Sequence, residues 1–413
     1  MKILFKNIKG LVGVMEDTPA FIAGKEMKNF CVMENAYLAV ENGRIVDFGE
    51  MQEWPGISDW SALEIIDAEG RYLLPTWCDS HTHTVFAQSR ALEFEDKING
   101  LTYQEIAQRG GGIINSAKAL SQIEEERLLK DALVRIQRMI KNGTGALEIK
   151  TGYGLDVENE LKMLRVIHRI RKEVNIPIKI TLLLAHALPE NFKNRMDDYV
   201  EYMIQELMPK AHEIGFDYID LFCERDYFQV VHLEKILTAA QALGKRGKVH
   251  LNQFYSIGGI SAALRLGVLS LDHVEVLEDH DLVALQQQPT IVTALPGCSL
   301  FTKIPYTPAR KLMDHNLPIA LATDFNPGSA PNGNMNLINS LACIQMQMNP
   351  QEVCAASCYN GAAAIELQHE VGSITIGKRA NLILTEPLDH LSELFYYFGE
   401  SRIESVWVNG VQQ

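Results

Sequence analysis

Residues 79–84 read DSHTHT, and they follow the apolar run YLLPTWC at residues 72–78. Alternate residues of a β-strand point to the same face, so the side chains of His81 and His83 would project together. The pair alone is weak evidence, because the 12 histidines among 413 residues give about 0.3 such pairs by chance. Two hydrogen-bonded surface histidines would explain it as well, so its meaning depends on the rest of the chain.

Seven further apolar runs follow, and helical patterns separate most of them. They are GALEIKT, IKITLLLAHA, DYIDLFCE, GKVHLNQ, LSLDHVEV, TIVTALP and PIALATD, which begin at residues 145, 178, 217, 247, 269, 290 and 318. Nearly continuous apolar runs are typical of parallel strands that are buried on both faces. In one helical pattern Leu161, Leu164, Ile167 and Ile170 recur at the spacing of one helix face. Eight such units over about 300 residues predict an α/β fold with a (β/α)8 barrel, and a doubly wound open sheet is the alternative.

Both ends of the chain predict β structure of another kind. AYLAVENGRIVDFGEM at 36–51 places two apolar stretches around Asn42-Gly43, which is a two-residue hairpin signal. The C-terminal segments GSITIGKRANLILTE and IESVWVNGVQQ alternate similarly, with turn residues at Gly377 and Asn409-Gly410. We therefore expect a small β-sandwich domain built from residues 1–72 and 367–413, and a catalytic barrel at 73–366.

The composition argues against several classes of protein. A net charge of −14 disfavours binding to nucleic acid through a broad basic surface. No apolar run reaches the roughly 18 residues that a membrane span needs, and MKILFKNIKGLVGVMED is not a convincing signal peptide. The seven cysteines are scattered and contain no CxxC pair, which indicates reduced thiols. We expect a cytoplasmic protein with no nucleic-acid or membrane partner.

Polar residues gather at the ends of the eight predicted strands, where barrels carry their active sites. These residues are His81, His83, Lys150, His186, Glu224, His250, His273 and Asp324. Three of the histidines and the aspartate form a candidate ligand set of His81, His83, His250 and Asp324. Imidazole and carboxylate ligands suit Zn²⁺, and also Fe²⁺ or Mn²⁺. Such an ion can lower the pKa of a bound water to about 7, whereas His250 taken alone would more simply be a packed core residue.

The segments around these residues resemble the amidohydrolase superfamily of metal-dependent hydrolases. DSHTH, His250, LDHVEV and ATDFNPGS carry the likeness to the superfamily as a whole. Longer stretches resemble those members that hydrolyse 4-imidazolone-5-propanoate to N-formimidoyl-L-glutamate in histidine degradation. These stretches are HTHTVFAQSRALEFEDKINGLTYQEIAQRGGGI, EIKTGYGL, LLLAHALPEN, DLFCE and LATDFNPGS. The resemblance implies a barrel with a composite β domain, one divalent metal ion (zinc or iron), a small-molecule substrate and a homodimer.

The resemblance also implies a role for each residue of the site. Metal-activated water would attack the ring carbonyl, and Asp324 would move its proton to the leaving nitrogen. His273 would stabilise the oxyanion, and His186 would donate to the ring carbonyl or to a ring nitrogen. Arg90 would bind the propanoate group through its guanidinium, although an isolated arginine more often forms a surface ion pair. Further substrate-binding residues by this likeness are Tyr153, Asn326, Gly328 and Ser329, although a plain turn would also explain Asn-Pro-Gly.

Two further strand-end residues and one loop are expected to lie near the site without binding the metal ion. Lys150 is expected to support the site, because the bridging lysine of two-metal relatives belongs further along the barrel. Glu224 stands where that lysine would be, which favours a single metal ion. The glycines of RGGGI at 109–113 suggest a loop that closes over the substrate, and no GK[ST] follows them to indicate a phosphate site.

Gln253 departs from the family pattern, in which a glutamate commonly follows the fifth-strand histidine by three residues. An amide has no useful proton-transfer chemistry, although it can donate and accept hydrogen bonds. Gln253 would therefore orient the ring while Asp324 and His273 carry the proton, or else the substrate differs or activity is lost. The alternatives are another cyclic-amide hydrolase, a deaminase, which would rely on that glutamate, and a non-catalytic barrel protein.

Overall fold

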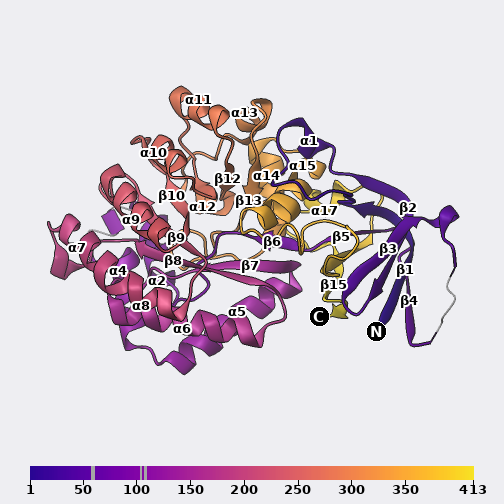
Figure 1. Cartoon of the computed structure of the whole chain (residues 1–413), viewed down its shortest axis with the longest axis horizontal. Helices are drawn as coiled ribbons and strands as arrows, with labels where there is room; N and C mark the ends of the chain where they lie inside the picture. Colours follow the sequence, from indigo (N-terminus) through magenta and orange to yellow (C-terminus); the bar gives the residue numbers. More distant parts are fainter. Residues whose placement is uncertain (57–60, 103–104, 107–108) are drawn as a thin grey trace.

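The larger part of the molecule is a ring of parallel strands with helices around its outside (Figure 1). The computed structural model describes residues 1–56, 61–102, 105–106 and 109–413. Within these residues the ring strands lie side by side in chain order: β6 (Trp77–Asp79), β7 (Thr144–Lys150), β8 (Ile178–Ala185), β9 (Tyr218–Cys223), β10 (Arg246–Leu251), β11 (Ser270–His273), β12 (Ile291–Ala294) and β13 (Ile319–Leu321). The predicted barrel is confirmed, and each predicted apolar run contributes one of its strands.

The ring closes between its first and last strands just beyond the end of β6. The backbone N–H of Asp324 donates to the carbonyl of His81 at 3.0 Å, and that of His83 donates to Phe325 at 2.9 Å. Below them the N–H and hydroxyl of Thr323 donate to the Asp79 carboxylate at 3.0 and 2.6 Å. The closure therefore holds together the segments that carry three of the four candidate metal ligands.

Helices such as α5 (Glu125–Lys141) and α6 (Val157–Glu173) cover the outer face of the barrel with an apolar stripe turned toward the strands. In α6 the predicted positions Leu161, Leu164, Ile167 and Ile170 are all buried. Other helices of six or more residues in the described chain are α2 (Ala91–Ile98), α4 (Gly112–Gln122), α7 (Met196–Tyr202), α8 (Met208–Ile214), α9 (Val230–Ala242), α10 (Gly259–Arg265), α11 (Asp279–Gln287), α12 (Pro296–Thr302), α13 (Ala309–Asp314), α14 (Met335–Met346) and the π-helical turn η4 (Ala355–Asn360). Shorter ones are α1 (Lys25–Lys28), η1 (Met51–Glu53), η2 (Glu190–Phe192), the π-helical η3 (Met203–Leu207), α15 (Pro350–Cys354), α16 (Gly361–Ala363) and α17 (Glu393–Tyr396).

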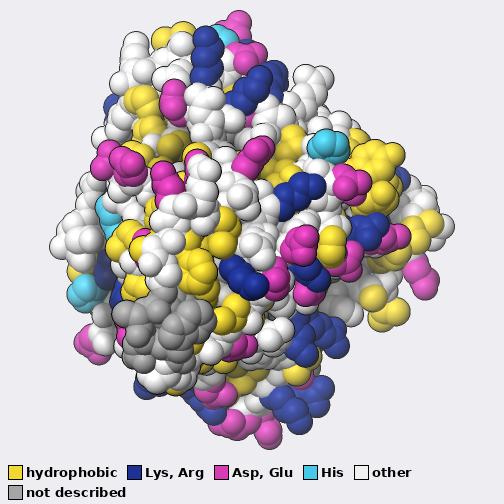
Figure 2. Space-filling view, turned by 90° about the vertical axis from the view of Figure 1, so that its right-hand side faces the viewer, with side chains coloured by type: hydrophobic (Ala, Val, Ile, Leu, Met, Phe, Trp, Pro, Cys, Tyr) yellow, Lys and Arg dark blue, Asp and Glu magenta, His cyan; other side chains and the backbone are white. Residues whose placement is uncertain are grey.

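Both chain ends form a separate mixed sheet, at the right of Figure 1. Its described strands are β1 (Lys2–Val12), β2 (Val32–Glu41), β3 (Arg44–Glu50), β4 (Leu63–Asp67), β5 (Arg71–Pro75), β14 (Leu382–Pro387), β15 (Ile403–Val408) and β16 (Val411–Gln412). Hydrogen bonds connect all of them through β1 and β5, so the expected sandwich is one continuous sheet around its own apolar core. Figure 2 views the molecule from this side, where acidic and basic side chains are mixed.

The predicted turns have the backbone geometry that their residues favour. Asn42 and Gly43, between β2 and β3, have φ values of 49° and 78°. Asn409 and Gly410, between β15 and β16, have φ values of 49° and 73°. Two successive residues with positive φ form the hairpin turn whose twist matches that of the flanking strands. Both hairpin predictions are therefore confirmed.

The run YLLPTWC serves two sheets. Strand β5 pairs with β1 and β14 of the terminal sheet, whereas β6 pairs with β7 of the barrel. The change takes place at Thr76, whose N–H donates to Asn381, while the next N–H, of Trp77, donates to Gly143. The domain division at residues 72 and 367 remains a prediction. Among the described helices, none is both long and apolar enough to cross a membrane.

Candidate metal and active site

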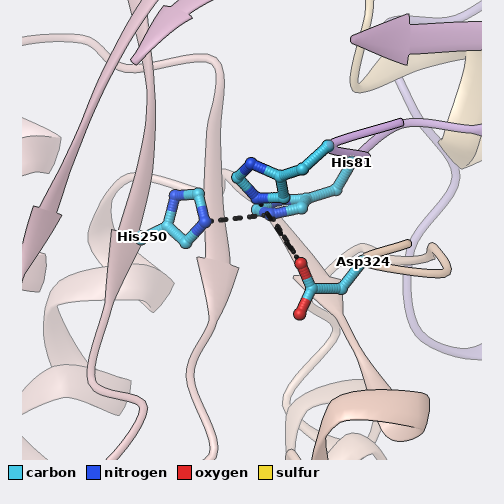
Figure 3. A group of neighbouring side chains, drawn as sticks. His81, His250 and Asp324 are labelled. Atoms are coloured by element: carbon cyan, nitrogen blue, oxygen red, sulfur yellow. Dashed lines mark hydrogen bonds and ion pairs between the residues drawn. The ribbon is translucent and has the colours of Figure 1, made fainter. Parts of the chain in front are cut away.

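Four side chains meet at the closure of the barrel (Figure 3). They are His81 and His83 after β6, His250 on β10 and Asp324 after β13. Figure 3 labels three of them, His81, His250 and Asp324. One ligand atom from each lies within 4.8 Å of the others, and all four residues are buried. Asp324 Oδ1 lies 3.6 Å from His81 Nε2 and 3.5 Å from His83 Nε2. The structure thus brings together the complete ligand set predicted from the sequence.

The Nε2 atoms of His81 and His250 are arranged to bind a cation and cannot hydrogen-bond to each other. The Nδ1 atoms of His81 and His250 each lie 2.7 Å from a carboxylate, Asp272 and Asp220 respectively. A neutral imidazole that donates from Nδ1 carries a lone pair on Nε2. Burial lowers the pKa of both imidazoles well below the ordinary value, so both are neutral at neutral pH. Their two Nε2 atoms nevertheless approach to 3.0 Å, which a divalent ion held between them would explain.

Lys150 ties the two supporting carboxylates together from below. Its ammonium lies 3.0 Å from Asp220, 3.5 Å from Asp272 and 2.9 Å from Glu148, and all four side chains are fully buried. Burial by itself would lower the pKa of Lys150, but the three carboxylates outweigh it and raise the pKa. The lysine remains charged and fixes the carboxylates that orient His81 and His250, in agreement with its predicted supporting role.

Glu224 points its carboxylate at backbone instead of at the ligands. Its oxygens accept hydrogen bonds from the N–H groups of Arg225, Phe254 and Tyr255 at 2.7, 2.8 and 3.3 Å. This carboxylate is therefore engaged in holding the loop that follows β10. The arrangement suits a single metal ion, as predicted from the sequence.

The loop after Asp324 is built around the side chain of Asn326. Its Oδ1 accepts from the N–H groups of Gly328 and Ser329, both at 2.8 Å. Its amide nitrogen donates to the carbonyl of Asp324 at 2.7 Å and to the Ser329 hydroxyl at 2.8 Å. The hydrogen-bonding groups of Asn326 thus shape the loop itself. Burial raises the pKa of Asp324 to about 6, which makes its carboxylate a better proton acceptor.

Arg90 and Gly328 occupy adjoining space. Arg90 precedes α2 and is buried, and its Nε lies 3.6 Å from the Glu93 carboxylate. A Cβ atom added to Gly328 would lie 0.9 Å from Nη2 of Arg90. Gly328 therefore leaves room for the Arg90 guanidinium. The sequence had predicted only that Gly328 binds substrate.

His186 follows β8 and packs against the metal ligand His83, and the hydrogen bond at its Nδ1 defines the role of its other ring nitrogen. Its Nδ1 lies 2.9 Å from the carbonyl of Gly152, and its ring stacks on His83 with centroids 5.5 Å apart. Burial lowers the pKa of His186 to about 4, so the ring is neutral at neutral pH. The proton on Nδ1 leaves Nε2 as a hydrogen-bond acceptor. The Tyr153 ring packs against His186 and His83 at 5.4 and 5.9 Å.

Gln253 reaches Asp324 through a residue that the sequence did not single out. Its amide nitrogen donates to the sulfur of Cys298 at 3.2 Å. Burial, followed by the charges of Asp324 and Glu275, raises the pKa of the Cys298 thiol, which therefore stays protonated beside Asp324. The position of Cys298, just after the LP that ends the seventh predicted strand, was the available signal.

His273 at the end of β11 has a carboxylate partner that sequence reasoning also missed. Its Nδ1 lies 3.1 Å from Oε1 of Glu275, and both side chains are almost completely buried. Burial would lower the pKa of His273, but the Glu275 carboxylate outweighs it and raises the pKa above the ordinary value. The spacing of two residues in LDHVEV was the only sequence signal for the pair.

Most of the predicted site residues line one pocket. Its lining combines cationic, imidazole, amide and carboxylate groups with a few apolar ones: His83, Arg90, Ile113, Tyr153, His186, Phe222, His250, Gln253, His273, Asp324, Asn326 and Ser329. The structure therefore gathers all the predicted site residues at the carboxyl ends of the strands, with His81 and Gly328 directly behind the wall.

Known proteins share both the sequence and the fold. Residues 72–412 match the Amidohydrolase family. The imidazolonepropionase of Christiangramia forsetii is 49% identical over 99% of both chains, and that of Flavobacterium johnsoniae is 47% identical over the same shares. The chain belongs to the imidazolonepropionases of the amidohydrolase family.

Solved structures show that the imidazolonepropionase chain shares its architecture with more distant hydrolases. A triazine hydrolase variant has a TM-score of 0.77 at 15% identity, with 100% of this chain and 94% of that one covered. An adenosine deaminase of Xanthomonas campestris with bound zinc has a TM-score of 0.71 at 17% identity, covering 99% and 92%. Likeness at this level of identity shows the fold alone.

Proposed function

We propose that the protein hydrolyses 4-imidazolone-5-propanoate to N-formimidoyl-L-glutamate. The observation that carries the proposal is Arg90, a buried guanidinium in the same pocket as the metal ligands. A substrate with a cyclic amide and a flexible carboxylate can place its ring over the ligands and its carboxylate at Arg90. Guanidinium and carboxylate form charge-assisted, often paired, hydrogen bonds. The relatives named imidazolonepropionase support the same substrate.

His81, His83, His250 and Asp324 would hold one divalent ion, zinc or iron. When bound, such an ion supplies a Lewis acid that activates water and polarises a carbonyl. Asp324 accepts the proton of the attacking water and returns it to the ring nitrogen that leaves, which balances the transfer. Burial of Asp324 favours its neutral form and so opposes the effect of the cation on this carboxylate.

The other polar groups position the ring. His273 donates from Nε2 to the oxygen that gains negative charge at the ring carbonyl. His186, whose Nδ1 is bound to Gly152, accepts a ring N–H at Nε2. Gln253 offers its amide oxygen to the ring while its nitrogen contacts Cys298. Tyr153 and Ser329 complete the polar wall, and the loop of Asn326 and Gly328 keeps Arg90 in place.

Turnover of freshly generated imidazolone propanoate tests this function. Metal-replete protein should remove the imidazolone absorbance and release formimidoylglutamate, whereas protein treated with a chelator should do neither. Guanine and cytosine serve as the comparison substrates, since a deaminase or another cyclic-amide hydrolase on this scaffold is the alternative. A deaminase is disfavoured because Gln253 cannot shuttle the proton to ammonia. Unchanged imidazolone absorbance with metal-replete protein would overturn the proposal.

The family resemblance also supports two broader proposals. We expect a homodimer, so light scattering should give twice the chain mass of 46.3 kDa. We also expect the protein to act in the cytoplasm, consistent with seven cysteines that are all free thiols.

A further inference from the structure

The backbone at the end of β11 is bent in an unusual way. His273 has a φ of 83° and Val274 a φ of 56°. Positive φ is costly for a residue with a side chain, and most of all for a β-branched one such as valine. The Thr307 hydroxyl holds the bend by donating to the carbonyl of His273 at 2.7 Å.

Glu275 lies two residues beyond His273, on the other side of the bend, and its side chain returns to the His273 ring. Here Glu275 Oε1 lies 3.1 Å from His273 Nδ1 and 3.4 Å from the Ser299 hydroxyl. Strained backbone tends to persist at functional sites, and here it lies between His273 and its carboxylate partner.

The carboxylate is not placed as a structural ion pair would be. Glu275 Oε2 is buried and has no hydrogen-bond partner in the described part of the chain. Leaving a buried carboxylate oxygen unpaired is costly, and folded proteins usually avoid it. By comparison, Glu224 at the end of β9 uses both of its oxygens on backbone N–H groups.

We propose that Glu275 is the positioning residue of His273 and acts on the reaction through that imidazole. It would thereby supply the site with a carboxylate, which relatives have at position 253 and this chain does not. The inference rests on the proposed hydrolysis and adds a residue to it. The Nδ1–H of His273 donates to Glu275, which orients the ring and turns Nε2 toward the pocket, and the anionic partner favours the doubly protonated ring, in which Nε2 also donates. Glu275 itself touches neither substrate nor metal ligand. The anionic partner also favours the charge distribution that develops on the imidazole when it donates to the substrate oxygen.

Glu275→Gln tests the inference because it keeps the size of the side chain and removes its charge. We expect kcat to fall on the order of 10²-fold, with KM, metal content and melting temperature close to those of the wild type. Glu275→Asp keeps the charge but shortens the reach, so its kcat should lie between the two, and it provides a second variant if Glu275→Gln folds poorly. Glu352→Gln is the matched control, since Glu352 on α15 is also buried but accepts hydrogen bonds from the Arg310 guanidinium and the N–H of Asn349.

A double-mutant cycle separates positioning from general structural support. In a His273→Gln background, adding Glu275→Gln should change kcat by less than about twofold, because residues that act as a unit are not additive. Wild-type kcat for Glu275→Gln, or full additivity with His273→Gln, would overturn the inference. Failure of the proposed function is a different result, because then the wild-type protein would not turn over imidazolone propanoate.

Discussion

At the scale of single residues, the proposed binding of the substrate carboxylate depends on Arg90 and on the absence of a side chain at Gly328. Arg90→Met keeps most of the volume and removes the charge. We expect KM to rise roughly 10- to 100-fold, from the 1.5–3 kcal/mol typical of a hydrogen bond to a charged group, with metal content unchanged. Steady-state kinetics and elemental analysis measure the two effects. An unchanged KM would mean that Arg90 does not bind the propanoate.

Gln253 is the second residue whose role can be measured directly. It contacts Cys298 and lies in the pocket wall, but an amide moves no proton. Gln253→Leu should therefore lower kcat by no more than about tenfold, as expected for the loss of one or two neutral hydrogen bonds. Asp324→Asn serves as the comparison and should abolish turnover and metal binding together. Equal losses in both variants would assign Gln253 a chemical role.

The sequence predicted the site residues that stand at the end of an apolar run. It did not predict the residues that contact them, Glu275 and Cys298. His81, His83, His250 and Asp324 stand out because polar groups at the ends of buried strands need a function. Glu275 and Cys298 do not stand out in this way. Their contacts arise from the bend at His273 and from the loop after β12, and no periodicity in the sequence encodes either one.

At the scale of elements, β7, β9 and β11 carry one buried charge network beneath the ligands. Each strand was visible in the sequence because it lies in a largely apolar run, as expected of a strand buried on both faces. Their register was not visible, so the meeting of Lys150 with Asp220 and Asp272 could not be predicted. For the same reason, the division of YLLPTWC between two sheets at Thr76 was missed.

Lys150→Met tests this network. Removing one partner of a buried ion pair leaves uncompensated charge, which typically costs about 3–5 kcal/mol. We expect a lower free energy of unfolding and weaker metal binding, because Asp220 and Asp272 would no longer hold His250 and His81. Denaturant titration and competition with a metal chelator measure these effects. Lys118→Met, on α4 and away from the site, is the control. Wild-type metal affinity in Lys150→Met would contradict the proposed support.

At the scale of the whole molecule, folding is linked to pH through the buried imidazoles. Burial lowers the pKa of His186 to about 4, below the ordinary value of about 6.5. Between these two pH values the unfolded chain binds a proton that the folded protein does not, so the free energy of unfolding falls as the pH falls. Over the full interval this group accounts for up to roughly 3 kcal/mol.

His186→Gln isolates that contribution. In metal-free protein, the loss of unfolding free energy between pH 7 and pH 4.5 should be smaller for the variant than for the wild type. Chemical denaturation at both pH values measures the difference. Parallel losses in the two proteins would show that His186 titrates normally in the folded state.

The central claim is that one metal ion, held by His81, His83, His250 and Asp324, serves the hydrolysis of imidazolone propanoate. The most direct measurement is turnover of that substrate while zinc or iron(II) is added back to metal-free protein. Activity should rise linearly and reach its maximum at one equivalent per chain, with formimidoylglutamate as product. Activity that saturates only at two equivalents, or no turnover at any loading, would contradict the claim.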